Sequence, residues 1–188
     1  MIAGLVLAAG AGSRFEGAVP KLLAPLNGRP LVEHAIAAIC AVPELERVVV
    51  VVGADPLDGV QFGRAERVVC ARWSEGQSAS LRCGVQALRG AERIVVTLGD
   101  EPLLSPAAIA LIAEQPPGAR ATYDGRPGHP VVLGREQIEA IASLSGDRGA
   151  RELLAGGLLV ECGDLCSGID VDTTADLEVI RSEAGAGV

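Results

Sequence analysis

Residues 2–21 read IAGLVLAAGAGSRFEGAVPK, and this stretch decides the fold class. Its first part, 2–7, is a short, continuously apolar run, which is typical of a buried parallel strand. Gly10 and Gly12 follow at once, so the chain must turn sharply where the strand ends. We expect both glycines to adopt positive φ and to expose backbone N–H groups, which together form an anion-binding nest.

Two basic side chains follow the glycine turn. Arg14 offers a planar fork of donors for phosphate oxygens, and Lys21 offers a mobile point charge. A dinucleotide fingerprint would require a small residue where Phe15 stands, and a P-loop would require a Gly-Lys-Ser/Thr triplet that the sequence lacks. A plain strand-to-helix turn explains the glycines but not the two cations. The stretch therefore predicts a binding loop for a phosphate-bearing ligand.

Apolar runs and segments of helical spacing alternate along the chain. This alternation predicts an α/β fold, a three-layer α/β/α sandwich with a mainly parallel, mixed sheet whose ligand lies beyond the carboxyl ends of the strands. After 2–7, the expected strands are 47–52, 66–71, 93–98, 119–123, 129–133 and 158–161, with a turn over 124–128. The expected helices are 30–42, one within 73–90, 106–114, 134–142, 147–155 and a closing helix that Thr173 or Thr174 caps.

Length and charge limit the possible functions. The 188 residues fit a single domain over 1–188, which at this size buries roughly 70% of the surface that the unfolded chain exposes. The formal net charge of −8 argues against nucleic acid or an anionic membrane as a partner, because both bind through excess Lys and Arg. A phosphate ligand therefore needs local backbone N–H groups, placed cations or a divalent metal held by carboxylates.

The five cysteines are expected to be reduced thiols. They are odd in number and scattered, and the chain shows neither a secretory segment nor an apolar run of the roughly 18 residues that a membrane span needs. Cys162 and Cys166 lack the spacing of a zinc knuckle, so core packing is the better interpretation of this pair. We therefore expect a cytoplasmic protein.

Three aspartates are candidates for binding a metal ion. Asp100 follows the expected strand 93–98 beside the predicted switch point of the sheet, where a carboxylate can hold Mg²⁺ against a triphosphate. It could equally be a polar turn residue that caps the next helix. Asp170 and Asp172 lie two residues apart, so an extended chain would place both on one face, where both could address one metal. Alternatively, Asp172 caps the closing helix.

Two other segments carry polar groups that suit a ligand. Gly76, Ser78 and Ser80 lie near the start of the helix within 73–90, where free N–H groups suit a ribose or a base edge. Ordinary N-capping explains one serine but not the whole segment. His129 lies between Gly and Pro residues and is expected to be exposed, either as a solvated loop histidine or as a ligand contact.

Several ordered blocks of the sequence resemble one family. LAAGAGSR (7–14), followed by PKL (20–22), is similar to the signature loop of nucleotidyltransferases with the nucleotide-diphospho-sugar-transferase-like fold. Within these, the chain most resembles the molybdenum cofactor cytidylyltransferases, which are MobA-like enzymes. The resemblance continues through LLAPLNGRPLVEHAI, WSEGQSASLRCGV, TLGDEPLLS, GRPGHPVVLG and GIDVDTTADLE, and so covers nearly the whole chain.

The resemblance implies transfer of CMP from CTP to the phosphate of molybdopterin, with release of pyrophosphate. Arg14, Lys21 and Asp100 are the implied catalytic residues, and Mg²⁺ or Mn²⁺ the implied cofactor. Asp100 would share the metal with Asp172, or failing that with Asp170, and His129 would lie near the acceptor. The implied nucleotide-binding residues are Leu7, Ala8, Ala9, Gly10, Gly12, Ser13, Arg14, Lys21, Gly76, Ser78 and Ser80.

Alternatives to this function stay open. Relatives with LAAG tend to use CTP and those with LAGG tend to use GTP; this chain has LAAG at 7–10. A guanylyltransferase on the same cofactor and a cytidylyltransferase on another phosphorylated acceptor are the closest alternatives. A non-catalytic carrier that delivers the cofactor to a molybdenum hydroxylase apoenzyme would not need Lys21, Asp100 and Asp172 together. Two departures from the family are Ala71 and Arg72 before the Trp, where an Asn is common, and Glu101, where an apolar residue is frequent.

Overall fold

A seven-stranded sheet forms the centre of the protein, of which the computed structural model describes residues 1–141 and 152–185. The strands are β1 (Ile2–Ala8), β4 (Arg47–Val52), β5 (Glu66–Val69), β6 (Arg93–Leu98), β7 (Arg120–Tyr123), β8 (Arg126–Leu133) and β9 (Leu159–Glu161). Their order is β5-β4-β1-β6-β8-β7-β9. β8 runs antiparallel to both of its neighbours, and the other pairings in this sheet are parallel. The predicted mixed, mainly parallel sheet is confirmed.

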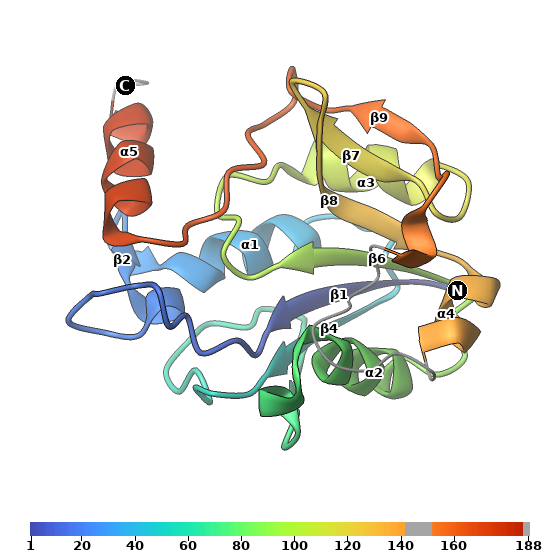
Figure 1. Ribbon diagram of the computed structural model, residues 1–188, viewed down its shortest axis with the longest axis horizontal. Coiled ribbons are helices and arrows are strands. Elements are labelled where there is room, and N and C mark those ends of the chain that lie inside the picture. The colour runs from blue at the N-terminus through green and yellow to red at the C-terminus, as the bar shows by residue number, and fades with distance from the viewer. Residues whose placement is uncertain (142–151, 186–188) are drawn as a thin grey trace.

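Helices cover both faces of this sheet (Figure 1). α1 and α3 lie on one face and α2 on the other, which gives the predicted three layers. None of the helices in the described part of the chain is long and apolar enough to cross a bilayer. The helices are α1 (Leu31–Cys40), α2 (Gln77–Ala87), α3 (Pro106–Glu114), α4 (Arg135–Ala140) and α5 (Thr174–Gly185), and the 3-10 turns are η1 (Lys21–Leu23), η2 (Trp73–Glu75) and η4 (Glu152–Leu154).

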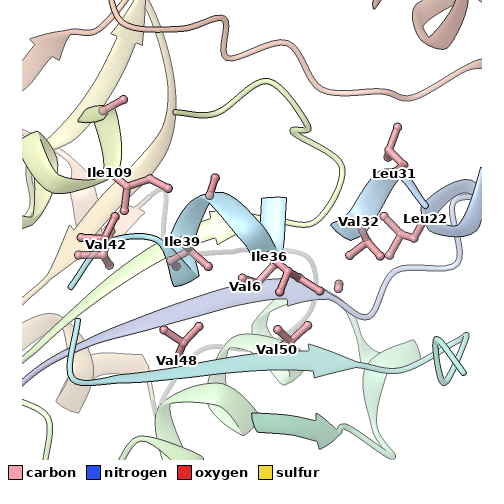
Figure 2. Packing of buried hydrophobic residues seen from close by; sticks show 14 of the residues in the cluster. Val6, Leu22, Leu31, Val32, Ile36, Ile39, Val42, Val48, Val50 and Ile109 are labelled. Carbon is pink, nitrogen blue, oxygen red and sulfur yellow. The ribbon is translucent and has the colours of Figure 1, made fainter. Parts of the chain in front are cut away.

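Aliphatic side chains of the strands fill the space beneath the helices. Figure 2 shows Val6, Val48 and Val50 below Ile36 and Ile39 of α1, and each of these residues is at most 1% exposed. Alternate strand residues point to the opposite face and pack against α2 there. Because aromatics make up only 2% of the sequence, Val, Leu, Ile and Ala build nearly the whole core.

The sheet order reverses at β1. From β1 the chain crosses to β4 and then β5 on one side, whereas β6 pairs with β1 on the other side. In open α/β sheets a ligand crevice forms where the order reverses, beyond the carboxyl ends of the strands. The ends of β1 and β6 therefore mark the place for a site, and Asp100 follows β6 there.

Two turns differ from the sequence prediction. The turn expected over 124–128 is only Asp124-Gly125, whose φ angles of 51° and 74° form a tight hairpin. β8 consequently starts at Arg126. Asn27-Gly28, with φ angles of 50° and 78°, forms a second tight hairpin between β2 (Pro25–Leu26) and β3 (Arg29–Pro30). This small sheet was not predicted, although Asn-Gly is a strong hairpin signal.

The remaining element predictions are confirmed with shifts at their ends. The strand expected at 66–71 ends at Val69, and the helix expected at 30–42 begins after Pro30. The helix expected over 147–155 falls partly outside the described residues, and its described part contains the 3-10 turn η4. All five cysteines are free thiols, and Cys162 is buried as expected for core packing.

A reciprocal hydrogen-bonded cap starts α5. Thr173 Oγ1 accepts from the backbone N–H of Asp176 at 3.2 Å, which confirms Thr173 as the capping residue. In return, Asp176 Oδ2 accepts from the N–H groups of Thr173 at 2.7 Å and Asp172 at 3.0 Å. This cap fixes the backbone of Asp172 and leaves its carboxylate free for other contacts, so Asp172 is not the capping side chain.

Replacing Asp176 by Asn should destabilise the fold in a pH-dependent way. Hydrogen bonds from Thr173 and from backbone N–H groups lower the pKa of Asp176 below its ordinary value of 3.8. A carboxyl whose pKa is lowered in the folded state stabilises the fold at pH values above its unfolded pKa, and this contribution disappears as the pH falls through the folded pKa. Thermal melts should therefore show a lower Tm for Asp176→Asn at neutral pH and a closing gap below pH 3.8.

Glu178→Gln is the matched control, because it removes the same charge from α5 at an exposed position outside the cap. Its Tm should stay close to wild type throughout. An Asp176→Asn gap that is as wide at acid pH as at neutral pH would contradict the charged cap.

Candidate active site

The loop after β1 turns at Gly12, not at Gly10. Gly12 has φ of 60°, and its carbonyl accepts from the N–H of Phe15 at 2.9 Å, which closes the turn. A Cβ at Gly12 would lie 2.9 Å from Cβ of Lys21, so Lys21 packs directly on this glycine. Gly10 does not adopt positive φ, so that part of the prediction is wrong. A Cβ at Gly10 would meet nothing within 4 Å, so this position borders open space.

A cavity of about 370 Å³ lies beyond the ends of β1 and β6, beside the start of α2. Its lining includes backbone and side chains from all three elements, as the reversal of the sheet order predicts. Six of the lining residues were predicted from the sequence: Leu7, Ala9, Gly10, Gly76, Ser80 and Asp100. Five were not: Ala11, Trp73, Ser74, Gln77 and Leu98, of which Trp73, Ser74 and Gln77 belong to the same WSEGQS block.

The start of α2 has no side-chain cap. Gly76 occupies the N-cap position with φ of 108° and makes no side-chain capping hydrogen bond. Gly76 and Gln77 both line the cavity, so this helix end borders it. Ser80 lines the cavity too, whereas Ser78 is fully buried and does not. Neither serine is the N-cap, so ordinary capping does not explain them.

Four charged side chains from three distant segments meet at the edge of this cavity. Lys21 Nζ lies 2.5 Å from Asp100 Oδ2 and 3.6 Å from Asp172 Oδ1. Arg14 Nη1 lies 2.8 Å from Asp172 Oδ2. The backbone N–H of Val171 donates to the carbonyl of Asp100 at 2.9 Å, which joins the two aspartate segments. The sequence singled out each of these four charges, and the structure places them together.

The two cations differ in exposure. The side chain of Lys21, the one lysine in the sequence, is 11% exposed and lies between two carboxylates, where water screens its charge poorly. The side chain of Arg14 is 75% exposed, so it can swing toward a ligand at little cost. Lys21 is therefore held in place by its two carboxylate partners, and Arg14 is the more adjustable cation of the site.

The carboxylates of Asp100 and Asp172 suit a divalent cation. Both address one cation position, which the Lys21 ammonium takes. Within residues 1–141 and 152–185, no group of three or more His, Cys, Asp or Glu side chains could hold a metal. Water and ligand phosphates would therefore complete the coordination, as is usual for Mg²⁺, which binds through one or two carboxylates and substrate phosphates. The donor set fits such a metal.

Three other predicted residues lie apart from this cluster. Asp170 is exposed, two residues before Asp172. Ser13 is exposed in the loop, and Ala8 is buried in the core on the α1 face. Ala8 differs in surroundings from Ala9 because neighbouring residues of a strand point to opposite sides, whereas Asp170 and Asp172 lie outside the strands, where this alternation does not apply.

His129 is not the exposed loop residue that the sequence suggested. It belongs to β8, its side chain is 22% exposed, and its Nδ1 lies 3.3 Å from Oε1 of Glu101. The side chain of Glu101 is 4% exposed. Neither this pairing nor the burial of Glu101 was predicted, and the sequence offers only the adjacency of Glu101 to Asp100 as a signal.

Known proteins resemble this chain over most of its length. The model of the MobA-like NTP transferase domain matches residues 4–162. Nicotine blue oxidoreductase of Paenarthrobacter nicotinovorans is 35% identical over an alignment of 204 positions, gaps included, which covers 94% of each protein. A 2-C-methyl-D-erythritol 4-phosphate cytidylyltransferase of Cereibacter sphaeroides is 36% identical over 128 residues, which cover 62% of this chain and 56% of that enzyme.

Solved structures share the fold over the full chain. A nucleotidyl transferase from Methanothermobacter thermautotrophicus superimposes with a TM-score of 0.80 at 25% identity, covering 100% of this chain and 99% of that one. The manganese complex of Rv0371c from Mycobacterium tuberculosis superimposes with a TM-score of 0.66 at 26% identity, covering 96% of this chain and 98% of that one. The nucleotide-diphospho-sugar-transferase-like fold is thereby confirmed, and a divalent metal has been observed in a similar protein.

The two loop glycines should fail in different ways when each is replaced by alanine. Gly12→Ala places a Cβ at positive φ and against Lys21, which costs about 1–2 kcal/mol. At about 2–4 °C per kcal/mol for a chain of this size, its Tm should fall by several degrees. Gly10→Ala should keep the wild-type Tm, because its Cβ faces open space, but should weaken nucleotide binding measured by calorimetry.

Each of these two variants serves as the control for the other. A Gly10→Ala protein that loses as much Tm as Gly12→Ala would contradict the assignment of the turn to Gly12. Unchanged nucleotide affinity in Gly10→Ala would contradict the assignment of the open space to the ligand.

Proposed function

The chain belongs to the MobA-like NTP transferase family, and from this premise we propose that it transfers CMP from CTP to the phosphate of molybdopterin, with release of pyrophosphate. The family supports nucleotidyl transfer from a nucleoside triphosphate. The choice of CTP and of molybdopterin is the finer part of the proposal, and it follows the resemblance of the five sequence blocks to the cytidylyltransferases of that cofactor.

One observation carries the proposal: Arg14, Lys21, Asp100 and Asp172 meet, and Asp100 also lines the cavity of about 370 Å³. A chain with a net charge of −8 must concentrate positive charge locally to hold a triphosphate. A carrier protein would need the cavity but not a buried lysine between two carboxylates. The cluster of charged residues therefore favours an enzyme over a non-catalytic carrier protein.

The reaction requires alignment more than proton transfer. A phosphomonoester, whose second pKa is about 6, is already ionised at neutral pH, so the acceptor needs no strong base. Its oxygen forms a bond to the α-phosphorus of CTP, and the bond from that phosphorus to the bridging oxygen of pyrophosphate breaks. The chain then has to hold both partners in line and to stabilise charge on the leaving group.

Each charged side chain has a place in this scheme. Lys21 leaves Asp100 and binds the α-phosphate, where negative charge develops. Arg14, mobile at 75% exposure, follows the departing pyrophosphate together with N–H groups of the Gly10–Ser13 loop. A divalent metal on Asp100 and Asp172, when bound, supplies further neutralisation of the phosphates.

The preference for CTP rests on Ala9. This residue lines the cavity and is 3% exposed, so its methyl group occupies space that a glycine would leave for a larger base. The similarity to a 2-C-methyl-D-erythritol 4-phosphate cytidylyltransferase supports the same choice. We therefore propose cytosine as the base.

A second candidate function is reduction of a conjugated nitrogen heterocycle. Its support is the 35% identity with nicotine blue oxidoreductase over 94% of both chains. In that case the cavity would hold a reduced nicotinamide cofactor in place of CTP, and no pyrophosphate would be released. Assays of nicotine blue reduction with NADH or NADPH separate the two candidates directly.

Wild-type protein with Mg²⁺, CTP and molybdopterin should release pyrophosphate, and replacing CTP by GTP should lower kcat/KM at least about tenfold. An enzymatic pyrophosphate assay measures both rates. A preference for GTP would overturn the assignment of the base, and no pyrophosphate with either nucleotide would overturn the transfer reaction with this acceptor.

Lys21→Ala should lower kcat about 10²–10³-fold, as expected when a group that stabilises developing charge is removed. The KM for CTP should change little, because Arg14 and the loop still hold the pyrophosphate part. Arg89→Ala is the control, since Arg89 is an exposed cation just after α2, at the helix end opposite the cavity. An unchanged kcat in Lys21→Ala would contradict the role of the lysine.

A further inference from the structure

Glu101 is a buried carboxylate of which only one of the two oxygens has a hydrogen-bond partner. Its side chain is 4% exposed, and Oε1 lies 3.3 Å from Nδ1 of His129. Within the described part of the chain, the buried Oε2 has no hydrogen-bond partner. Because an unpaired buried carboxylate oxygen lowers the stability of a fold, Glu101 is not explained by stability.

His129 is fixed at two points. The hydroxyl of Tyr123 donates to the backbone carbonyl of His129 at 2.6 Å, and Glu101 faces Nδ1 of the ring. A carboxylate accepts hydrogen bonds, so Nδ1 carries the hydrogen of this contact. Nε2 is then the ring nitrogen that stays available to a ligand, and the 22% exposure of the side chain gives a ligand access.

The position of β8 in the sheet shows on which side of Asp100 His129 lies. Val131 of β8 pairs with Val96 of β6, so the residues before Val131 run beside the chain that leads to Asp100 and Glu101. In the sheet order, β8 flanks β6 on the side away from β1. His129 and the glycine loop after β1 therefore lie on opposite flanks of Asp100.

Phosphoryl transfer places the attacking and the leaving oxygen on opposite sides of the phosphorus. If the loop after β1 takes the pyrophosphate, the acceptor approaches from the flank of β8. We propose that Glu101 is a positioning residue that holds His129 so that Nε2–H of the ring donates to a phosphate oxygen of the acceptor, with a hydrogen on each ring nitrogen. The assignment of that flank to the acceptor rests on the proposed function, whereas binding of a phosphomonoester at His129 can be measured without it.

The test is an NMR titration of histidine-labelled protein with methyl phosphate, the smallest phosphomonoester, and with no nucleotide present. The sequence has two histidines, and the other, His34, donates from Nε2 to the carbonyl of Leu26 at 2.9 Å on α1, so its ring is an internal control. In wild type, the His129 ring signals should move saturably and those of His34 should stay.

Two variants of Glu101 separate the effect of its hydrogen bond to His129 from the effect of its side-chain volume. Glu101→Met fills the same space without an acceptor and should raise the Kd of methyl phosphate at His129 about tenfold. Glu101→Gln keeps an oxygen for Nδ1 and should remain within about threefold of wild type. Thermal melts of Glu101→Met and Glu101→Gln accompany the titrations, which are run well below the Tm of each protein, so weaker binding is not attributed to unfolding.

Three results would overturn the proposal: no saturable shift at His129, equal affinity in Glu101→Met and wild type, or a loss in Glu101→Gln as large as in Glu101→Met. Failure of the proposed function appears elsewhere, as absence of pyrophosphate release from CTP and molybdopterin. If that transfer occurs, Glu101→Met should also raise the KM for the acceptor about tenfold and leave the KM for CTP unchanged.

Discussion

A nearly buried ammonium held between two carboxylates is the contact on which the site depends. Lys21 Nζ joins Asp100, which follows β6, to Asp172, which precedes α5, and Lys21 itself comes from the loop after β1. Three segments that are far apart in sequence are thus drawn to one edge of the sheet. Two carboxylates that contact the same ammonium in a poorly solvated place repel each other, so the lysine charge is needed to hold them together.

The rest of the fold supplies rigid anchors for this contact. β1 and β6 are buried, neighbouring parallel strands, so their carboxyl ends cannot move independently. The cap formed by Thr173 and Asp176 fixes the backbone of Asp172 on the third segment. Arg14 is exposed and can adapt. A lysine that two carboxylates hold at the site and an arginine that can adapt suit a reaction in which one phosphate must be aligned and another must leave.

The sequence predicted the strands, the helix cap and the charged residues of the site, but it did not predict which of these residues contact one another. The apolar strands, Asp100 after β6 and the Thr173 cap follow from patterns within a few residues. The contact of Lys21 with Asp100 spans 79 residues, and the burial of Glu101 against His129 depends on β8 lying beside β6, which no local pattern encodes. Gly10 was misjudged because sequence shows that a glycine is present, not whether φ or free space requires it. Trp73 lines the cavity, but a single tryptophan in a sequence does not show whether it packs in a core or borders a ligand.

The central claim is that Lys21 holds the metal-binding carboxylates until nucleotide and metal arrive together. Because the sequence has one lysine, ¹⁵Nζ-lysine labelling gives a single side-chain ammonium signal to follow by NMR. The account predicts that Mg²⁺ alone leaves this signal in place, and that CTP with Mg²⁺ moves it to a new position as Lys21 passes from Asp100 to the α-phosphate. A signal that Mg²⁺ alone displaces as far, or that CTP with Mg²⁺ does not move, would contradict it.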